Sequence, residues 1–85
     1  MPTSRSNHDP ERAVRWEATR ASVGARIRAL RLDRGLTQEQ VALVSGVARH
    51  MLVQVERGQR GLLYERLVDI ADALDVHPST LLEDL

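Results

Sequence analysis

The chain has 85 residues, contains no cysteine and carries a formal net charge of zero. This length fits one small domain, and the lack of cysteine excludes disulfides, thiolate zinc sites and cysteine nucleophiles. No apolar run approaches the roughly twenty residues that cross a bilayer, and the N-terminus lacks the apolar core of a secretion signal, so we expect a cytoplasmic protein stabilised by helix packing.

The charges are divided unevenly along the chain. Residues 1–60 contain eleven arginines and six carboxylates, a formal charge of +5, whereas residues 61–85 contain one arginine and six carboxylates, a charge of −5. This asymmetry favours a protein in which a basic surface from residues 1–60 faces phosphate groups and an acidic surface from residues 61–85 points away from them. The alternative is that acids and arginines simply coat the helix surfaces.

The N-terminal part predicts an arm followed by a helix. Residues 1–9 are polar without periodicity and are expected to form a flexible arm, and Arg5 makes insertion into a minor groove a minor alternative. The sequence Asp9-Pro10-Glu11 predicts a helix start, with the aspartate as cap and the proline at the first helical position. Residues 10–19 are expected to be a helical extension, either separate from the next helix or continuous with it. Trp16 is expected to pack on the core or on a dimer partner rather than on DNA.

The next helix is predicted to end at Arg34-Gly35. Its buried stripe consists of three apolar residues at helical spacing, Val23, Ile27 and Leu30. Arg31 falls one turn after this stripe and is expected to lie partly inside. Because a buried guanidinium needs a carboxylate, we expect Glu56 to be its partner.

The stretch from Leu36 to Gly58 predicts two short helices joined by a three-residue turn. Thr37 can cap the first helix, and Gln40, three residues later, completes a capping box. This helix is expected to stop near Ser45, because Gly46 can adopt a left-handed conformation without a Cβ penalty.

The second helix of this stretch is predicted from about Ala48 to Arg57, with Leu52 and Val55 on its inward face. Four side chains are expected to point away from the core, Arg49, His50, Val53 and Gln54. A helix that presents polar side chains outward after a tight turn is typical of a DNA reader.

The C-terminal part predicts a loop at residues 59–61 and two further helices. The fourth helix should end near Asp75, and its buried face consists of Leu67, Ile70, Ala71 and Leu74. Pro78 is placed in the first turn of a last short helix. The fold class is therefore all-α, with five or six helices and no strands.

Three segments, RIRALRLDRGLTQEQVALVSGV, VERGQR and LVDIADALDVHPSTLL, together resemble the Cro/cI (Xre) family of helix-turn-helix domains. The resemblance covers about residues 20–84, and the order of its pieces is highly specific. It implies a five-helix, lambda-repressor-like domain, which we place at residues 20–85. Such a domain would bind double-stranded operator DNA as a homodimer, with its third helix in the major groove.

The resemblance also implies roles for individual residues. Base reading falls to Arg49, His50, Val53 and Gln54, and the chemistry agrees, since arginine can bond guanine and glutamine can bond adenine through two hydrogen bonds each. Contacts to the DNA backbone fall to Thr37, Gln38, Met51, Arg57 and Arg60. Gln38 would also brace the first reading side chain, and Met51 has a thymine methyl as an alternative target. Arg31 and Glu56 match a buried ion pair of the family.

Two departures from the family pattern carry further expectations. Ala48 stands where a serine or threonine usually caps the recognition helix, so the start of that helix is expected to be weak. Leu62, Leu63 and Tyr64 are three consecutive large apolar residues, and at least one is expected in a dimer interface, with Leu81 and Leu85 as neighbours. The alternative is a locally repacked core.

Catalysis has little support in the sequence. The three histidines are scattered, no paired histidines or clustered carboxylates suggest a metal, and we expect no cofactor and no enzyme activity.

The main hypothesis is a sequence-specific, homodimeric transcription regulator acting on a roughly palindromic operator. Restriction-modification controllers, phage-type repressors and antitoxins stay open within it. The alternative is a protein-interaction module or antitoxin-type partner, whose apolar, acidic C-terminal part holds a toxin or another regulator.

Overall fold

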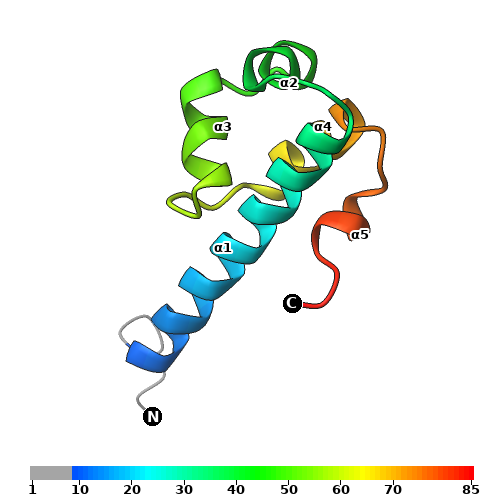
Figure 1. Cartoon of the computed structure of the whole chain (residues 1–85). Helices are drawn as coiled ribbons and strands as arrows, with labels where there is room; N and C mark the ends of the chain where they lie inside the picture. The colour runs from blue at the N-terminus through cyan, green and yellow to red at the C-terminus, as the bar shows by residue number, and fades with distance from the viewer. Residues whose placement is uncertain (1–8) are drawn as a thin grey trace.

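The computed structural model describes residues 9–85, which form five α-helices and no strand, as the sequence predicts (Figure 1). The helices are α1 (Pro10–Asp33), α2 (Gln38–Ser45), α3 (Arg49–Glu56), α4 (Tyr64–Ala73) and α5 (Pro78–Leu81). The predicted N-terminal arm lies outside the described residues except for Asp9. Within the described part, no helix is long and apolar enough to cross a membrane.

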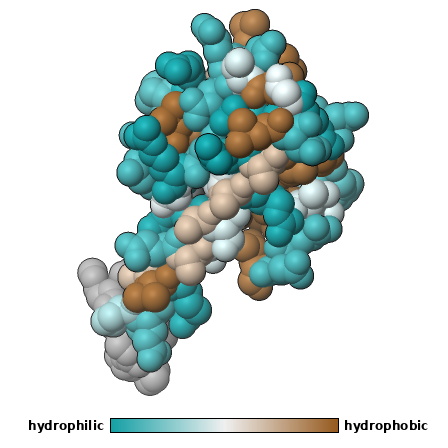
Figure 2. Space-filling model, in the orientation of Figure 1, coloured by the Kyte–Doolittle hydropathy of each residue, from teal (hydrophilic) through white to brown (hydrophobic). Residues whose placement is uncertain are grey.

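The first helix is one continuous element of 24 residues. The Asp9 side chain caps it by accepting a hydrogen bond from the Glu11 amide at 2.9 Å, and Pro10 occupies the first turn, as predicted. The N-terminal half of α1 projects from the body of the protein, whereas its C-terminal half lies among the other helices (Figures 1 and 2). Trp16 lies on the projecting half and is 45% exposed, so it does not pack on the core.

The core forms where the C-terminal half of α1 meets α3 and where α2 meets α4. Its buried apolar residues are Ile27, Val41, Val47, Leu52, Val55, Leu67, Ile70, Ala71, Leu74 and Leu81. Val23 and Leu30 are half-buried at its edge, so Ile27 is the centre of the predicted stripe. Gly24 allows α1 and α3 to approach closely, since a Cβ at this position would overlap the carbonyl oxygen of Val55.

Three helices end in the same hydrogen-bonded turn, in which the residue after the cap adopts a positive φ. This residue is Gly35 after α1, with a φ of 68°, Gly58 after α3, with a φ of 74°, and Asp75 after α4, with a φ of 57°. The end of α1 agrees with the prediction, and α4 ends at Ala73, two residues earlier than predicted. In each turn the backbone itself satisfies the last carbonyl groups of the helix.

Arg26 of α1 binds the last short helix through its side chain. One terminal nitrogen of Arg26 donates a hydrogen bond of 2.7 Å to the carbonyl oxygen of Thr80. The same side chain forms a 3.4 Å ion pair with Glu83. In α5, Leu81 enters the core and is only 1% exposed, so its predicted place in a dimer interface is wrong. The neighbouring Leu82 takes the outward position.

Candidate nucleic-acid interface

The segment that carries the candidate site begins with a fully formed capping box. The Thr37 hydroxyl accepts a hydrogen bond from the Gln40 amide at 3.0 Å, and the Gln40 side chain accepts one from the Thr37 amide at 2.8 Å. At the other end of α2, Gly46 adopts a φ of 78° and its amide bonds the carbonyl oxygen of Ala42. Because both ends of α2 are fixed by local hydrogen bonds, the direction in which α3 leaves the turn is fixed as well.

Helix α3 has one buried face and one open face. Leu52, Val55 and Glu56 are buried against the rest of the protein. On the open side, Arg49 and His50 are exposed, and Val53 and Gln54 are half-buried. The structure therefore brings the four predicted base-reading residues onto one accessible surface.

The start of α3 lacks a side-chain cap, because Ala48 occupies the capping position and has no oxygen to offer. Met51 is the third residue of the helix, so its backbone N–H has no carbonyl group four residues earlier within α3. Its side chain is half-buried and packs against the core. The group that Met51 offers to an anion is therefore its backbone N–H rather than its side chain.

A buried ion pair joins α1 to α3 beneath this surface. Arg31 donates through Nε to one carboxylate oxygen of Glu56 at 2.7 Å and through a terminal nitrogen to the other at 2.9 Å. The hydrogen bond to Glu56, which outweighs desolvation, raises the pKa of the Arg31 guanidinium. This is the ion pair that burial of Arg31 predicts.

The pair also fixes a residue of the candidate site. The Gln38 side-chain nitrogen donates a 3.1 Å hydrogen bond to the Glu56 carboxylate, and a terminal nitrogen of Arg31 bonds the Leu36 carbonyl oxygen at 2.9 Å. One carboxylate thereby joins α1, the start of α2 and the end of α3. The sequence did not predict the hydrogen bond of Gln38 with Glu56 or that of Arg31 with Leu36.

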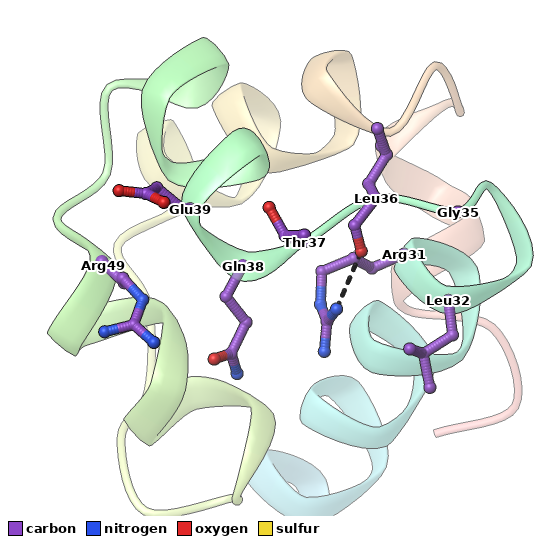
Figure 3. A pocket seen from close by; sticks show the side chains of 8 residues that line it. All are labelled: Arg31, Leu32, Gly35, Leu36, Thr37, Gln38, Glu39 and Arg49. Carbon is purple, nitrogen blue, oxygen red and sulfur yellow. Dashed lines mark hydrogen bonds between the residues drawn. The ribbon is translucent and has the colours of Figure 1, made fainter.

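An open hollow of about 660 Å³ lies between the end of α1, the start of α2 and Arg49 at the start of α3. Figure 3 shows Gln38 between Arg49 and Arg31, with the side-chain oxygen of Gln38 turned toward Arg49. Thr37 and Glu39 also line it. Arg49 and the start of α2 thus face the same space, where a guanidinium and the positive end of a helix dipole are available to an anion.

The loop after α3 lies against the same open face. Arg57 is exposed at the helix end, and Gly58 adopts a φ of 74°. From the loop, Nε of Arg60 donates a 2.9 Å hydrogen bond to the side-chain oxygen of Gln54. The sequence analysis assigns Arg60 to the DNA backbone and Gln54 to a base, and it does not predict a hydrogen bond between them.

The predicted dimer residues occupy different environments. Leu62 is half-buried and packs against the core, whereas Leu63 and Tyr64 are 72% and 76% exposed. Leu85 is also exposed, at 59%. A mainly apolar hollow of about 340 Å³ lies beside this region; it is lined by Thr19, Arg20, Val23, Val55, Arg60, Gly61, Leu62, Tyr64, Leu67 and Leu82. Among residues 9–85, no cluster of metal-ligating side chains is present.

Comparison with known proteins agrees with this architecture. A helix-turn-helix family model matches residues 27–81. Two HTH-type transcriptional regulators of Sinorhizobium fredii are similar to the chain. One, y4aM, is 35% identical over 78 residues, which are 91% of this chain and 54% of the relative. The other, y4dJ, is 40% identical over 57 residues, which are 67% of this chain and 74% of the relative. The chain thus spans about half the length of the first relative.

A solved structure is also similar along most of its length. The restriction-modification controller protein C.AhdI from Aeromonas hydrophila superposes with a TM-score of 0.74 at 41% sequence identity. The match covers 75% of this chain and 97% of the controller protein. The chain therefore belongs to the helix-turn-helix family of the Cro/cI type.

Proposed function

We propose that the chain is a sequence-specific, DNA-binding transcription regulator whose helix α3 enters the major groove. The open face of α3, with Arg49, His50, Val53 and Gln54 on one accessible surface, carries this proposal. The major groove is about 12 Å wide, which admits an α-helix with its side chains. In this proposal residues 20–85 form the DNA-binding domain and residues 10–19 form its helical extension.

The contacts around α3 support separate tasks for the surrounding residues. Arg49 would bond guanine through two hydrogen bonds, with the oxygen of Gln38 holding its guanidinium from the other side. The start of α2 and the N–H of Met51 would bind phosphate groups, as helix N-termini do. Thr37 and Arg57, which are exposed at the rim of this surface, would add backbone contacts that fix the position of the protein without reading bases.

We propose that the protein acts as a homodimer on a roughly palindromic operator. Leu63, Tyr64 and Leu85 are mostly exposed apolar side chains, which a second copy of the chain can cover. A twofold dimer would place two copies of α3 about 34 Å apart, in successive turns of the major groove. The similarity to a restriction-modification controller protein covers 97% of that protein, and it favours a controller-type regulator.

Binding selection from random duplex DNA tests this proposal. The purified protein should enrich a symmetric site with half-site centres about 10 base pairs apart. Arg49→Ala should cost about 1–3 kcal/mol and relax the preference at one base pair. Arg57→Ala is the matched control, since loss of a phosphate contact should weaken all sequences alike and reduce the salt dependence. An equal loss on every sequence for Arg49→Ala would exclude its role in base reading.

The dimer is tested separately by sedimentation. Leu63→Glu places a charge on the exposed apolar surface and should yield a folded monomer, because burying an unpaired carboxylate in an interface is costly. Val14→Glu, an equally drastic change on the exposed projecting half of α1, is the control and should leave the dimer intact. A folded Leu63→Glu protein that stays dimeric would refute this interface.

The same surface favours a second candidate function, the binding of another protein such as a toxin or regulator. Residues 61–85 combine exposed apolar side chains with an excess of five negative charges, which suits a partner with a basic, partly apolar surface. This candidate predicts that no DNA sequence is enriched and that Leu63→Glu abolishes binding of that partner. Enrichment of a symmetric DNA site would favour the first proposal.

A further inference from the structure

The hydrogen bond between the loop residue Arg60 and the α3 residue Gln54 links a predicted backbone contact to a predicted base contact. The donor is Nε of Arg60, the acceptor is the side-chain oxygen of Gln54, and their separation is 2.9 Å. Within residues 9–85, this is the one hydrogen bond that either side chain makes. It therefore determines how the Gln54 amide is oriented before any DNA is bound.

The turn that leads from α3 to Arg60 is fixed by backbone hydrogen bonds. The Gln59 amide bonds the Gln54 carbonyl oxygen at 2.9 Å, and the Gly58 amide bonds the Val55 carbonyl oxygen at 3.0 Å. These two bonds form the turn that closes a helix through a residue of positive φ. Gly58 also packs against Ala21 of α1, leaving no space for a larger residue. Arg60 thus leaves a fixed turn directly beside Gln54.

The orientation of the amide decides which base it can read. A glutamine that reads adenine uses its oxygen to accept from the amino group and its nitrogen to donate to N7. In this structure the oxygen of Gln54 faces Arg60, so the amino group is the part left to face the groove. An amide that presents donors matches guanine, whose N7 and O6 both accept, better than adenine, which presents one donor and one acceptor.

We propose that Arg60 is a positioning residue that sets the base preference of Gln54 to guanine. The bond uses only Nε, so the two terminal nitrogens of Arg60 remain for a phosphate group, and one guanidinium can fix both the DNA backbone and the reading side chain. This inference rests on the proposed function. It differs from a simple phosphate contact in one respect, because loss of a phosphate contact leaves base preference unchanged.

Arg60→Lys is the decisive variant. It keeps the positive charge for phosphate but replaces the Nε–H by a methylene group, which cannot donate to Gln54. Arg57→Lys is the matched control, since Arg57 lies at the same end of α3 and makes no hydrogen bond to Gln54. Both substitutions are at exposed positions, so folding is expected to be retained.

Binding selection with the full chain measures the effect. Gln54→Ala first identifies the base pair that Gln54 reads, as the position whose preference is lost. At that position the wild-type protein should select guanine, and Arg60→Lys should shift the guanine-to-adenine ratio toward adenine by about tenfold, within the range of a two-bond contact. Arg57→Lys should leave the ratio unchanged.

The possible failures are distinguishable. If the wild-type protein enriches no site, the proposed function fails and this inference falls with it. If a site is enriched but the wild type selects adenine at the Gln54 position, or Arg60→Lys keeps the wild-type preference, only the inference is refuted. NMR of the free protein gives an independent measurement: Arg60→Lys should shift the side-chain amide signals of Gln54, and Arg57→Lys should not. Unchanged Gln54 signals in Arg60→Lys would also refute the inference.

Discussion

Replacing Glu56 by glutamine tests whether the buried ion pair holds α3 in place. In the native protein the Glu56 carboxylate accepts hydrogen bonds from two nitrogens of Arg31 and one nitrogen of Gln38. Its side chain is 3% exposed and that of Arg31 is 9% exposed. Glu56→Gln preserves the shape but removes the charge and one of the two acceptor oxygens.

The cost follows from this geometry. Whichever way the new amide is turned, its NH₂ group faces a nitrogen donor of Arg31 or Gln38, so at least one hydrogen bond is lost and two donors are brought together. The buried guanidinium is also left without a counter-charge. Breaking such a pair costs about 3–5 kcal/mol, and we expect about 3 kcal/mol here because one acceptor remains. This is a large part of the stability of a small domain.

Urea unfolding followed by circular dichroism measures the change. With a slope of about 1 kcal/mol per molar urea, the midpoint of Glu56→Gln should fall by roughly 3 M. Arg31→Met with Glu56→Gln removes both charges and lets the new amide bond Gln38, so the double variant should be no less stable than Glu56→Gln alone. If the double variant loses the sum of the two single losses, the pair has no coupling energy and the reasoning is wrong.

Three further predictions concern the backbone, and each is measured by thermal or urea unfolding. Ala48→Ser supplies the missing cap of α3 and should stabilise the protein by about 1 kcal/mol, whereas Ala48→Val, which adds bulk without a capping oxygen, should not. Gly24→Ala should destabilise by about 1–3 kcal/mol, because its Cβ meets the Val55 carbonyl; Ser22→Ala at an exposed position of α1 should have little effect. Asp75→Gly should stabilise the protein by about 0.5–1 kcal/mol, since it removes the backbone strain of an aspartate with a positive φ and a negative charge at the end of α4. If this variant is no more stable than the native protein, Asp75 is not strained.

The sequence predicted the frame of the helix-turn-helix segment because that frame depends on local chemistry. Thr37 and Gln40 cap each other within one turn, and Gly46 ends α2 through a backbone conformation that its missing Cβ permits. The ion pair of Arg31 and Glu56 joins residues far apart in sequence, yet it was predictable, since the helical period buries Arg31 and a buried guanidinium requires a carboxylate.

Adjacent residues of the same type were harder to assign. Leu81 and Leu82 have the same apolar character, and in a helix of four residues no period indicates which one faces the core. The structure buries Leu81 and leaves Leu82 45% exposed. The position of Arg26 was missed for a related reason, because its partners Thr80 and Glu83 lie beyond α4 and their approach depends on how α5 folds back onto α1.

In the proposed function, the contact of Arg60 with Gln54 makes residue type alone insufficient to predict the base that Gln54 binds. The two lie six positions apart in the sequence, and their contact requires a glycine of positive φ in the turn after α3 and a loop that folds back over the helix. Each requirement is local, but their combination places a donor beside the side-chain oxygen of Gln54. Residue type predicts adenine for a free glutamine, whereas this geometry predicts guanine. The target sequence is therefore expected to depend on the loop after α3 as well as on the helix itself.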